Sequence, residues 1–348
     1  MHRQRKSHKS ESFEQKYINF IDDATVFKKE TNGYINLFES QTNGRTVLKL
    51  FENLTRAIPT DKIKYDEGVW IEATKSGAII WGDQYMGEGY KYDYCSMYPS
   101  IMNAANSYPV KRGKFKVLTQ EEFMGHSLSE IGIYRCVVEK QSDNQYAKKL
   151  FRWNPKNFYT NVDLLLAKEL NLKVIMVRDR QPNYLSYSED ACMKGYDIFG
   201  TYVDLIFPLK HRKIPRAKQF LTMLWGVLGQ RSDLGYSILR ENSSMLDISS
   251  LNFKQLNGNI YRTNYARTIP FILAYGRAKI STTMMPFISN VVRCATDGFI
   301  AKIPLEISTG TNMGELRYEG YCKKCIVHHC NKVEGEFIVD DKIENVIS

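Results

Sequence analysis

Two β-rich runs flank the dipeptide Asp297-Gly298, within the segment Val-Val-Arg-Cys-Ala-Thr-Asp-Gly-Phe-Ile-Ala-Lys-Ile at 291–303. Asp-Gly between two such runs is the strongest short-range signal for a β-hairpin, because both residues tolerate the backbone angles of a tight turn. The segment therefore predicts two neighbouring antiparallel strands with a carboxylate at their turn. Taken alone, a surface turn without function is the simpler interpretation.

A second acidic residue closes another predicted strand. The run Tyr90-Lys-Tyr-Asp93 is strand-like, and Tyr94-Cys-Ser-Met-Tyr98-Pro-Ser follows it. A carboxylate at a strand end stands on a rigid element, where metal ligands are commonly found. We therefore expect Asp93 to project from the end of a sheet.

A helical segment follows Pro215, which suits a helix start because the first turn does not need its missing N–H. Along this helix Lys218, Thr222, Trp225 and Gly226 are separated by steps that place them on one face. The sequence thus predicts a stripe that combines a cation, a hydroxyl and a flat ring.

Hydrophobic periodicity predicts the remaining elements. We expect a helix near Val47–Ile58, strand-like structure over Val69–Trp81, a helix followed by a strand over Val162–Val177, and a helix from about Ile269 to Thr283.

The net charge narrows the range of partners. The chain has 348 residues, with 48 Lys and Arg against 38 Asp and Glu, a formal charge of +10 and a pI of about 9.1. This excess attracts polyanions, so nucleic acid is the leading candidate, while a cationic protein without such a partner stays open. No 18-residue apolar run and no secretory signal is visible, so we expect an intracellular, non-secreted protein without a membrane partner; its compartment stays open.

Five potential metal ligands lie close together near the C-terminus. They are Cys322, Cys325, His328, His329 and Cys330. Structural zinc sites usually take two ligand pairs from separate elements, and no second pair at suitable spacing is visible here. Ordinary strand and turn residues are the favoured interpretation, and metal binding is the alternative.

In their order, three segments resemble motifs A, B and C of family B DNA polymerases, which read D-x-x-S-L-Y-P-S, K-x-x-x-N-S-x-Y-G and Y-x-D-T-D-S. Their counterparts here begin at Asp93, Lys218 and Ala295. The resemblance is strongest to the protein-primed branch of phages, adenoviruses, linear plasmids and mobile elements. It spans roughly Val69–Gly335, including Gly-Ala-Ile-Ile-Trp-Gly before motif A and Met313–Gly320 after motif C.

The resemblance implies a two-metal site. Asp93 matches the motif A ligand, the Tyr94 carbonyl matches a backbone ligand, and Asp297 matches the main motif C ligand. Two Mg²⁺ ions would be held there, with Mn²⁺ as an alternative. One ion activates a 3′-hydroxyl and the other holds a triphosphate.

The resemblance also implies nucleotide contacts. Lys218 matches the motif B lysine that meets the triphosphate, and Tyr98 matches the residue beneath the sugar that leaves no room for a 2′-hydroxyl. Trp225 replaces the motif B tyrosine, and Lys210 and Arg212 lie where a basic residue of the first finger helix would contact phosphates.

Several positions depart from the family pattern. Ala295 replaces the first motif C aspartate, Thr222-Met223 replaces Asn-Ser, and Gly298 replaces Ser. The 92 residues before Asp93 contain no D-x-E, so we expect no exonuclease, and the 13 residues after Gly335 are too few for a normal thumb.

The predicted fold class is α+β, a right-hand polymerase with an antiparallel palm sheet, helical fingers and a thumb that is short or absent. The predicted organisation is a basic flexible arm (1–10), a lead-in lobe (11–68), palm with motif A (69–110), an α/β insertion (111–200), fingers with motif B (201–232), a connecting insertion (233–262), palm with motif C (263–310), and the palm end with a residual thumb (311–348).

The predicted function is template-directed DNA synthesis, a nucleotidyl transfer to a 3′-hydroxyl. The implied partners are DNA primer–template and deoxynucleoside triphosphates, and use of a terminal protein as primer stays open. A weak or inactive polymerase relic that only binds nucleic acid is the alternative, favoured by Ala295 and the short C-terminus. An α/β protein in which Asp297-Gly298 is merely a turn is a third interpretation.

Overall fold

The computed structural model describes residues 12–40, 42–140, 146–232 and 260–339, so the predicted basic arm and most of the connecting insertion lie outside the described residues. The chain forms two compact units. One comprises Met1–Ala57 and Thr201–Val227, and the other comprises Ile58–Gly200 and Leu228–Ser348. Within the described ranges, every helix is too short or too polar to span a lipid bilayer.

The first unit is helical. It contains α1 (Phe13–Glu30), α2 (Leu37–Ser40), α3 (Asn43–Leu54), most of α9 (Gly195–His211) and nearly all of α10 (Ala217–Leu228). Aromatic side chains hold these helices together: the Phe27 and Phe220 rings lie 4.8 Å apart, and Tyr202 donates a hydrogen bond to the carbonyl of Phe220 at 3.0 Å. Apolar packing between amphipathic faces therefore stabilises this unit.

The predicted helix near Val47–Ile58 is present as α3, but it begins four residues earlier and ends at Leu54. The Thr42 hydroxyl accepts a hydrogen bond from the Arg45 amide and caps the helix start. Such N-caps satisfy amides that lack a partner within the helix. This cap explains the earlier start.

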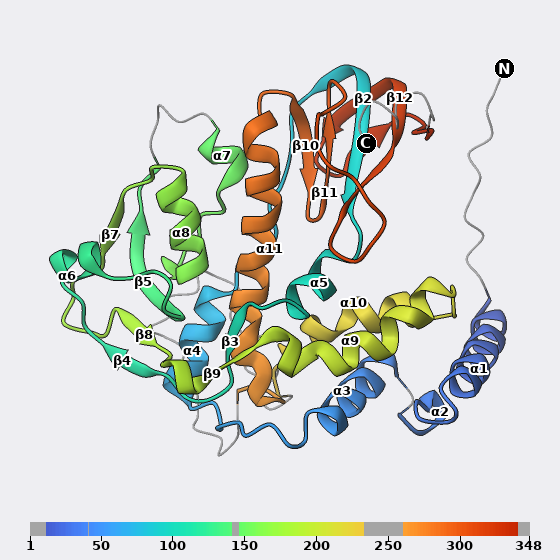
Figure 1. Ribbon diagram of the computed structural model, residues 1–348, viewed down its shortest axis with the longest axis horizontal. Coiled ribbons are helices and arrows are strands. Elements are labelled where there is room, and N and C mark those ends of the chain that lie inside the picture. The colour runs from blue at the N-terminus through green and yellow to red at the C-terminus, as the bar shows by residue number, and fades with distance from the viewer. Residues whose placement is uncertain (1–11, 41, 141–145, 233–259, 340–348) are drawn as a thin grey trace. The chain divides into compact units, whose positions relative to one another are not determined.

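The second unit contains a six-stranded antiparallel sheet in the order β1-β10-β11-β2-β12-β13. Figure 1 shows the long strands β2 and β12 side by side, which agrees with their register from Tyr94 opposite Leu316 to Tyr85 opposite Val327. The strands are β1 (Ile80–Gly82), β2 (Tyr85–Tyr94), β10 (Val291–Ala295), β11 (Gly298–Ala301), β12 (Leu316–His329) and β13 (Lys332–Glu334).

A smaller sheet lies between motif A and α9 in the sequence, in the order β4-β8-β5-β6, with β7 also paired to β5. Its strands are β4 (Lys114–Lys116), β5 (Gly132–Val138), β6 (Phe158–Thr160), β7 (Val174–Met176) and β8 (Tyr184–Ser186), accompanied by α6 (Gln120–Gly125), α7 (Ala147–Leu150) and α8 (Asn161–Glu169). The short strands β3 (Ser107–Pro109) and β9 (Cys192–Lys194) pair separately.

Helix α11 (Ile269–Met284) connects several parts of this unit. Its Arg277 makes a buried ion pair with Asp163 of α8, at 2.8 Å, and donates to the carbonyls of Ser76 and Gly77. Arg267 lies just before α11, in the short helix η4 (Asn264–Thr268), and forms a fully buried pair with Glu67, at 2.7 Å. A buried charge that lost its partner would be costly, so these pairs fix the arrangement of the surrounding segments.

The expected strand-like structure over Val69–Trp81 is wrong for its first half, because Tyr65–Thr74 forms helix α4 and only Ile80–Gly82 is a strand. The apolar residues at 69–71 favour a strand locally. However, Asp66 and Glu67 are acidic residues in the first turn of α4, where they suit a helix start. In the last turn, the Thr74 hydroxyl donates a hydrogen bond to the Trp70 carbonyl at 2.7 Å. The buried pair of Glu67 with Arg267 adds a contact 200 residues away, which local patterns do not show.

The other predicted elements are confirmed. Asp93 lies at the end of β2, the 162–177 segment forms α8 and then β7, α10 follows Pro215, and α11 covers the expected helix. The predicted hairpin is β10–β11, but its two-residue turn is Thr296-Asp297, and Gly298 is the first residue of β11. The α+β class with an antiparallel sheet and a helical region is likewise confirmed.

Candidate active site

The hairpin and the end of β2 bring Asp93 and Asp297 together. Strand β11 pairs with β2 so that Gly298 lies opposite Asp93, and Asp297 precedes Gly298 at the hairpin turn. The Tyr94 amide donates to the Asp297 carbonyl at 2.9 Å, which fixes the turn against the strand end. Two acids far apart in the sequence therefore occupy neighbouring positions at one end of the sheet.

The Asp93 carboxylate lies directly over Gly298. A Cβ at position 298 would stand 2.5 Å from Asp93 Oδ1 and 2.8 Å from the Tyr92 carbonyl, both closer than real Cβ contacts. Within the turn, Thr296 adopts a positive φ of 66° and donates its amide to the Ile79 carbonyl. Glycine at position 298 thus leaves space that the Asp93 side chain fills.

The electrostatic environment of Asp93 opposes its ionisation. Burial, followed by the charges of Asp297 and Glu319, raises the pKa of Asp93 to about 7, while Lys91 and Arg317 act in the opposite direction. Crowded acids of this kind occur where a protein binds a cation or transfers protons. Lys91 and Arg317 therefore offset only part of the burial and negative charge that act on the Asp93 carboxylate.

Three charged residues beside Asp93 were not anticipated from the sequence. Arg317 lies opposite Asp93 in β12, and Glu319 pairs with Arg317 and with Lys91, whose Nζ is 2.6 Å away. Burial opposes ionisation of Glu319, but hydrogen bonds from Lys91 and Arg317 bring its pKa below the usual value. The alternation of charges along β12 is visible in the sequence, but its register against β2 is not.

Tyr94 and Tyr98 are both buried beside the acids. Tyr94 ends β2, and its hydroxyl lies 2.6 Å from the Thr283 hydroxyl on α11. Tyr98 belongs to α5 (Met97–Met102), and burial raises its pKa to about 12. The structure therefore places the three motif A candidates, Asp93, Tyr94 and Tyr98, around one turn.

The other predicted nucleotide contacts belong to the helical unit. Lys218 is exposed on α10 and Trp225 is half-buried, whereas Phe220, Leu221 and Leu224 form the buried side of this helix. This pattern agrees with the predicted stripe.

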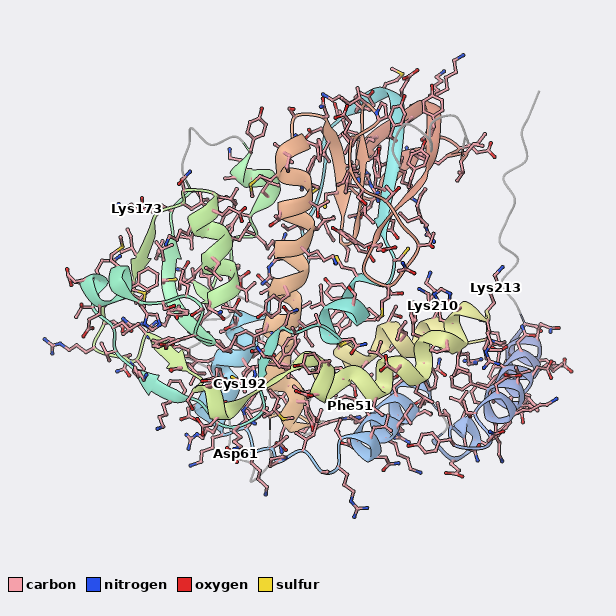
Figure 2. All side chains as sticks on the ribbon, viewed as in Figure 1. Phe51, Asp61, Lys173, Cys192, Lys210 and Lys213 are labelled. Atoms are coloured by element: carbon pink, nitrogen blue, oxygen red, sulfur yellow. The ribbon has the colours of Figure 1, made fainter. Side chains whose placement is uncertain are left out.

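Lys210 and Arg212 lie around the end of α9. Figure 2 shows Lys210 and Lys213 at the turn between α9 and α10. Lys210 Nζ is 5.7 Å from the centroid of the Phe207 ring, and Arg212 pairs with Glu30 at 2.7 Å. Since both Arg212 and Glu30 stay accessible to water, this pair is a weak interaction that a phosphate could replace.

The cysteines near the C-terminus belong to β12 and the turn after it. Cys322 and Cys325 are buried in an apolar cluster with Val292 and Ile300. Burial, and then the charge of the nearby Cys322, raises the pKa of Cys325 to about 11. His328 pairs with Glu334 at 3.0 Å. In the described part of the chain, no group of three or more Cys, His, Asp or Glu residues is arranged to hold a metal ion.

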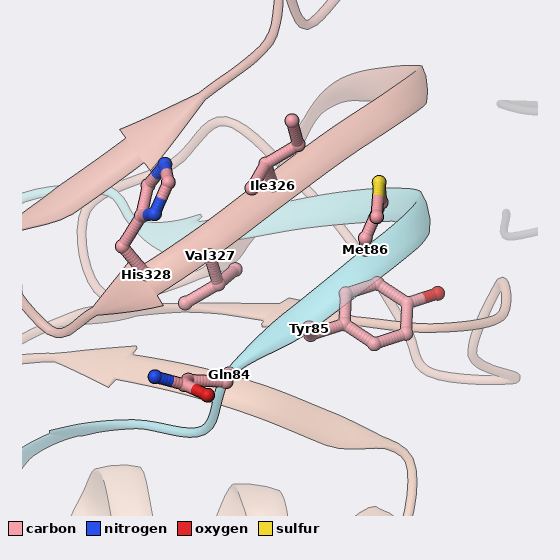
Figure 3. Close-up of a pocket in the computed structure, with 6 residues that line it drawn as sticks. All are labelled: Gln84, Tyr85, Met86, Ile326, Val327 and His328. Carbon is pink, nitrogen blue, oxygen red and sulfur yellow. The ribbon is translucent and has the colours of Figure 1, made fainter.

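A shallow pocket of about 410 Å³ lies at the other end of β2 (Figure 3). It is lined by Gln84, Tyr85, Met86, Ile326, Val327 and His328. Tyr85 precedes Asp93 by eight residues in one strand, which corresponds to about 26 Å at roughly 3.3 Å per residue. This pocket is therefore separate from the two acids.

Comparisons with known proteins show a similarity of fold. No protein-family model and no curated protein matches the sequence. Phi29 DNA polymerase complexed with single-stranded DNA aligns with 100% of this chain and 68% of its own, with a TM-score of 0.63 and 16% identity. Its ternary complex with primer-template DNA and incoming nucleotide substrates aligns with 98% of this chain and 64% of its own, with a TM-score of 0.64 and 15% identity. The chain thus has a Phi29-like DNA polymerase fold.

Proposed function

We propose that this protein is a template-directed DNA polymerase that transfers deoxynucleotides to a 3′-hydroxyl by a two-metal mechanism. The observation that carries the proposal is the position of Asp93 beside Asp297 at the end of an antiparallel sheet, where the charge of Asp297 contributes to the raised pKa of Asp93. The Phi29-like fold and the order of the three sequence motifs support it. Because identity to Phi29 polymerase is low, the activity rests on these residues rather than on the fold alone.

The donor set suits Mg²⁺. Asp93 and Asp297 supply hard carboxylate oxygens, and the Tyr94 carbonyl adds a third oxygen donor. The pKa of Asp93 is raised first by burial and then by the charges of Asp297 and Glu319, and a bound cation would offset these charges. When bound, two such ions would activate the 3′-hydroxyl and stabilise the charge on the transferred phosphoryl group.

The chain's own residues have distinct proposed roles. Asp93 and Asp297 hold the ions, Lys218 neutralises charge on the triphosphate, and Tyr98 packs beneath the sugar. Trp225 provides a flat surface near the nascent base pair.

Lys210 and Arg212 are proposed to bind phosphates. Arg212 would exchange its surface pair with Glu30 for a phosphate oxygen, a contact that its planar guanidinium suits.

A second candidate function is binding of nucleic acid without efficient catalysis. Ala295 favours it, because this residue of β10 supplies a methyl group where the family has a further carboxylate. The net charge of +10 is compatible with either function.

Primer extension with Asp93→Asn and Asp297→Asn separates the two functions. We expect each variant to lose incorporation by at least about a hundredfold while fluorescence anisotropy shows unchanged duplex binding, because only metal ligands change. Asp190→Asn, at an exposed position outside the site, is the matched control and should behave as wild type. Duplex binding without incorporation by wild type, at any Mg²⁺ or Mn²⁺ concentration, would favour the binding-only function.

A further inference from the structure

One face of α11 packs against the turn that carries Tyr94 and Tyr98. Gly276, Lys279 and Thr283 follow at steps of three and four residues, so they share that face. The Lys279 ammonium lies 4.6 Å from the centroid of the Tyr94 ring, and Thr283 contacts the hydroxyl of the same residue. The turn is therefore held against a long helix at several points.

Lys279 also anchors the loop before β12. Its Nζ donates to the Gly314 carbonyl at 2.8 Å, and the Gly314 amide donates to the Cys95 carbonyl at 2.6 Å. The Cys95 amide in turn donates to the Glu315 carbonyl at 2.8 Å. Because the turn is bonded on this side as well, a displacement of α11 or of its side chains would be transmitted to the turn.

Gly276 of α11 lies close to the Tyr98 ring. A Cβ at position 276 would lie 2.8 Å from Cε1, 3.2 Å from Cζ and 3.3 Å from the hydroxyl oxygen of Tyr98. Both residues are buried. A glycine in the middle of a helix normally weakens it, so close packing of the ring gives a physical reason for glycine here.

We propose that Gly276 is a positioning residue that sets sugar selectivity, because the absence of a side chain at 276 leaves the space that the Tyr98 ring occupies. This inference rests on the proposed function, in which Tyr98 packs beneath the deoxyribose. With no side chain at 276, the Tyr98 ring lies close to the α11 backbone. A methyl group there must displace the ring, and a small misplacement in a packed site has large kinetic effects.

A double-mutant cycle tests whether Gly276 acts through Tyr98. The ratio of deoxynucleotide to ribonucleotide kcat/KM is measured for wild type, Gly276→Ala, Tyr98→Ala and the double variant. We expect Gly276→Ala to change this ratio by about tenfold in the wild-type background and to have no effect in the Tyr98→Ala background. Tyr98→Leu, which also lacks the clashing ring atoms, replaces Tyr98→Ala if the latter fails to fold.

Gly125→Ala is the matched control. Gly125 ends the exposed helix α6, and a Cβ there meets no atom within 4 Å. This variant should leave the sugar ratio unchanged in both backgrounds. A ratio unaffected by Gly276→Ala, or changed by the same factor in both backgrounds, overturns the proposal.

Thermal unfolding of the same four proteins provides a readout that does not need activity. We expect Gly276→Ala to lower the melting temperature when Tyr98 is present and not to lower it when the ring is removed. Equal shifts in both backgrounds would show that the contact does not exist. Absence of incorporation by wild type would overturn the proposed function and the sugar-selecting role with it, while the unfolding cycle would still decide the contact.

Discussion

Removal of the Asp93 carboxylate should stabilise the protein in the absence of divalent cations. The pKa of Asp93 is about 7 in the folded chain, against an ordinary value of 3.8. A shift of about three units corresponds to roughly 4 kcal/mol, and screening of a half-buried group by solvent reduces this to about 2 kcal/mol. Asp93→Asn should therefore raise the free energy of unfolding by about 2 kcal/mol at pH 8.

The sign of the effect depends on pH. Because the folded chain binds this proton more tightly than the unfolded chain, the contribution of Asp93 to stability is fully present below about pH 4. It is lost as the pH rises towards 7. Urea denaturation in EDTA should thus show Asp93→Asn and wild type to be equally stable at pH 4 and increasingly different up to pH 8.

Addition of Mg²⁺ should reverse the difference at pH 8, because an ion that binds the folded wild type stabilises it and the variant has lost a ligand. Asp190→Asn is the control: the pKa of Asp190 is lowered, first by a hydrogen bond from Ser188, so its removal should not stabilise the protein. An Asp93→Asn variant that is no more stable than wild type at pH 8, or that is as much more stable at pH 4 as at pH 8, would show that ionised Asp93 does not destabilise the folded chain.

Three further predictions concern separate residues. Lys218→Ala should raise the apparent KM for nucleotide about tenfold or more, the equivalent of a charged hydrogen bond of roughly 1.5–3 kcal/mol, with less effect on kcat in steady-state kinetics. Ala295→Asp should lower the Mg²⁺ concentration needed for half-maximal primer extension several-fold; an unchanged metal requirement would contradict a role for position 295. Glu67→Gln should lower the free energy of unfolding by about 3–5 kcal/mol because it leaves Arg267 buried without its partner, and urea denaturation that shows less than about 1 kcal/mol would contradict this.

Elements with strong local signals could be predicted from the sequence. The two β-rich runs around Asp297-Gly298 predict the β10–β11 hairpin, although its turn lies one residue earlier, at Thr296-Asp297. Helical periodicity predicts α10 and α11. The placement of Asp93 at a strand end also follows from its local pattern. These signals depend on neighbouring residues, which a sequence shows directly.

Contacts between distant segments could not be predicted in this way. The apolar residues of helix α4 favour a strand locally, whereas the helix is held by a buried ion pair that joins its Glu67 to Arg267. Likewise, Arg317 reaches Asp93 only through the register of β12 on β2, which contains irregularities that shift the pairing. The raised pKa of Asp93 arises from that same long-range arrangement.

In the proposed mechanism, Asp93 and Asp297 jointly hold the catalytic metal ions. Anomalous diffraction from crystals grown with primer–template, incoming nucleotide and Mn²⁺ tests it directly. We predict a peak within coordination distance of both carboxylates and of the Tyr94 carbonyl, and its loss in Asp297→Asn crystals. Bound DNA and nucleotide without an ion between the two acids, or an ion that persists in the variant, would contradict metal binding by Asp93 and Asp297.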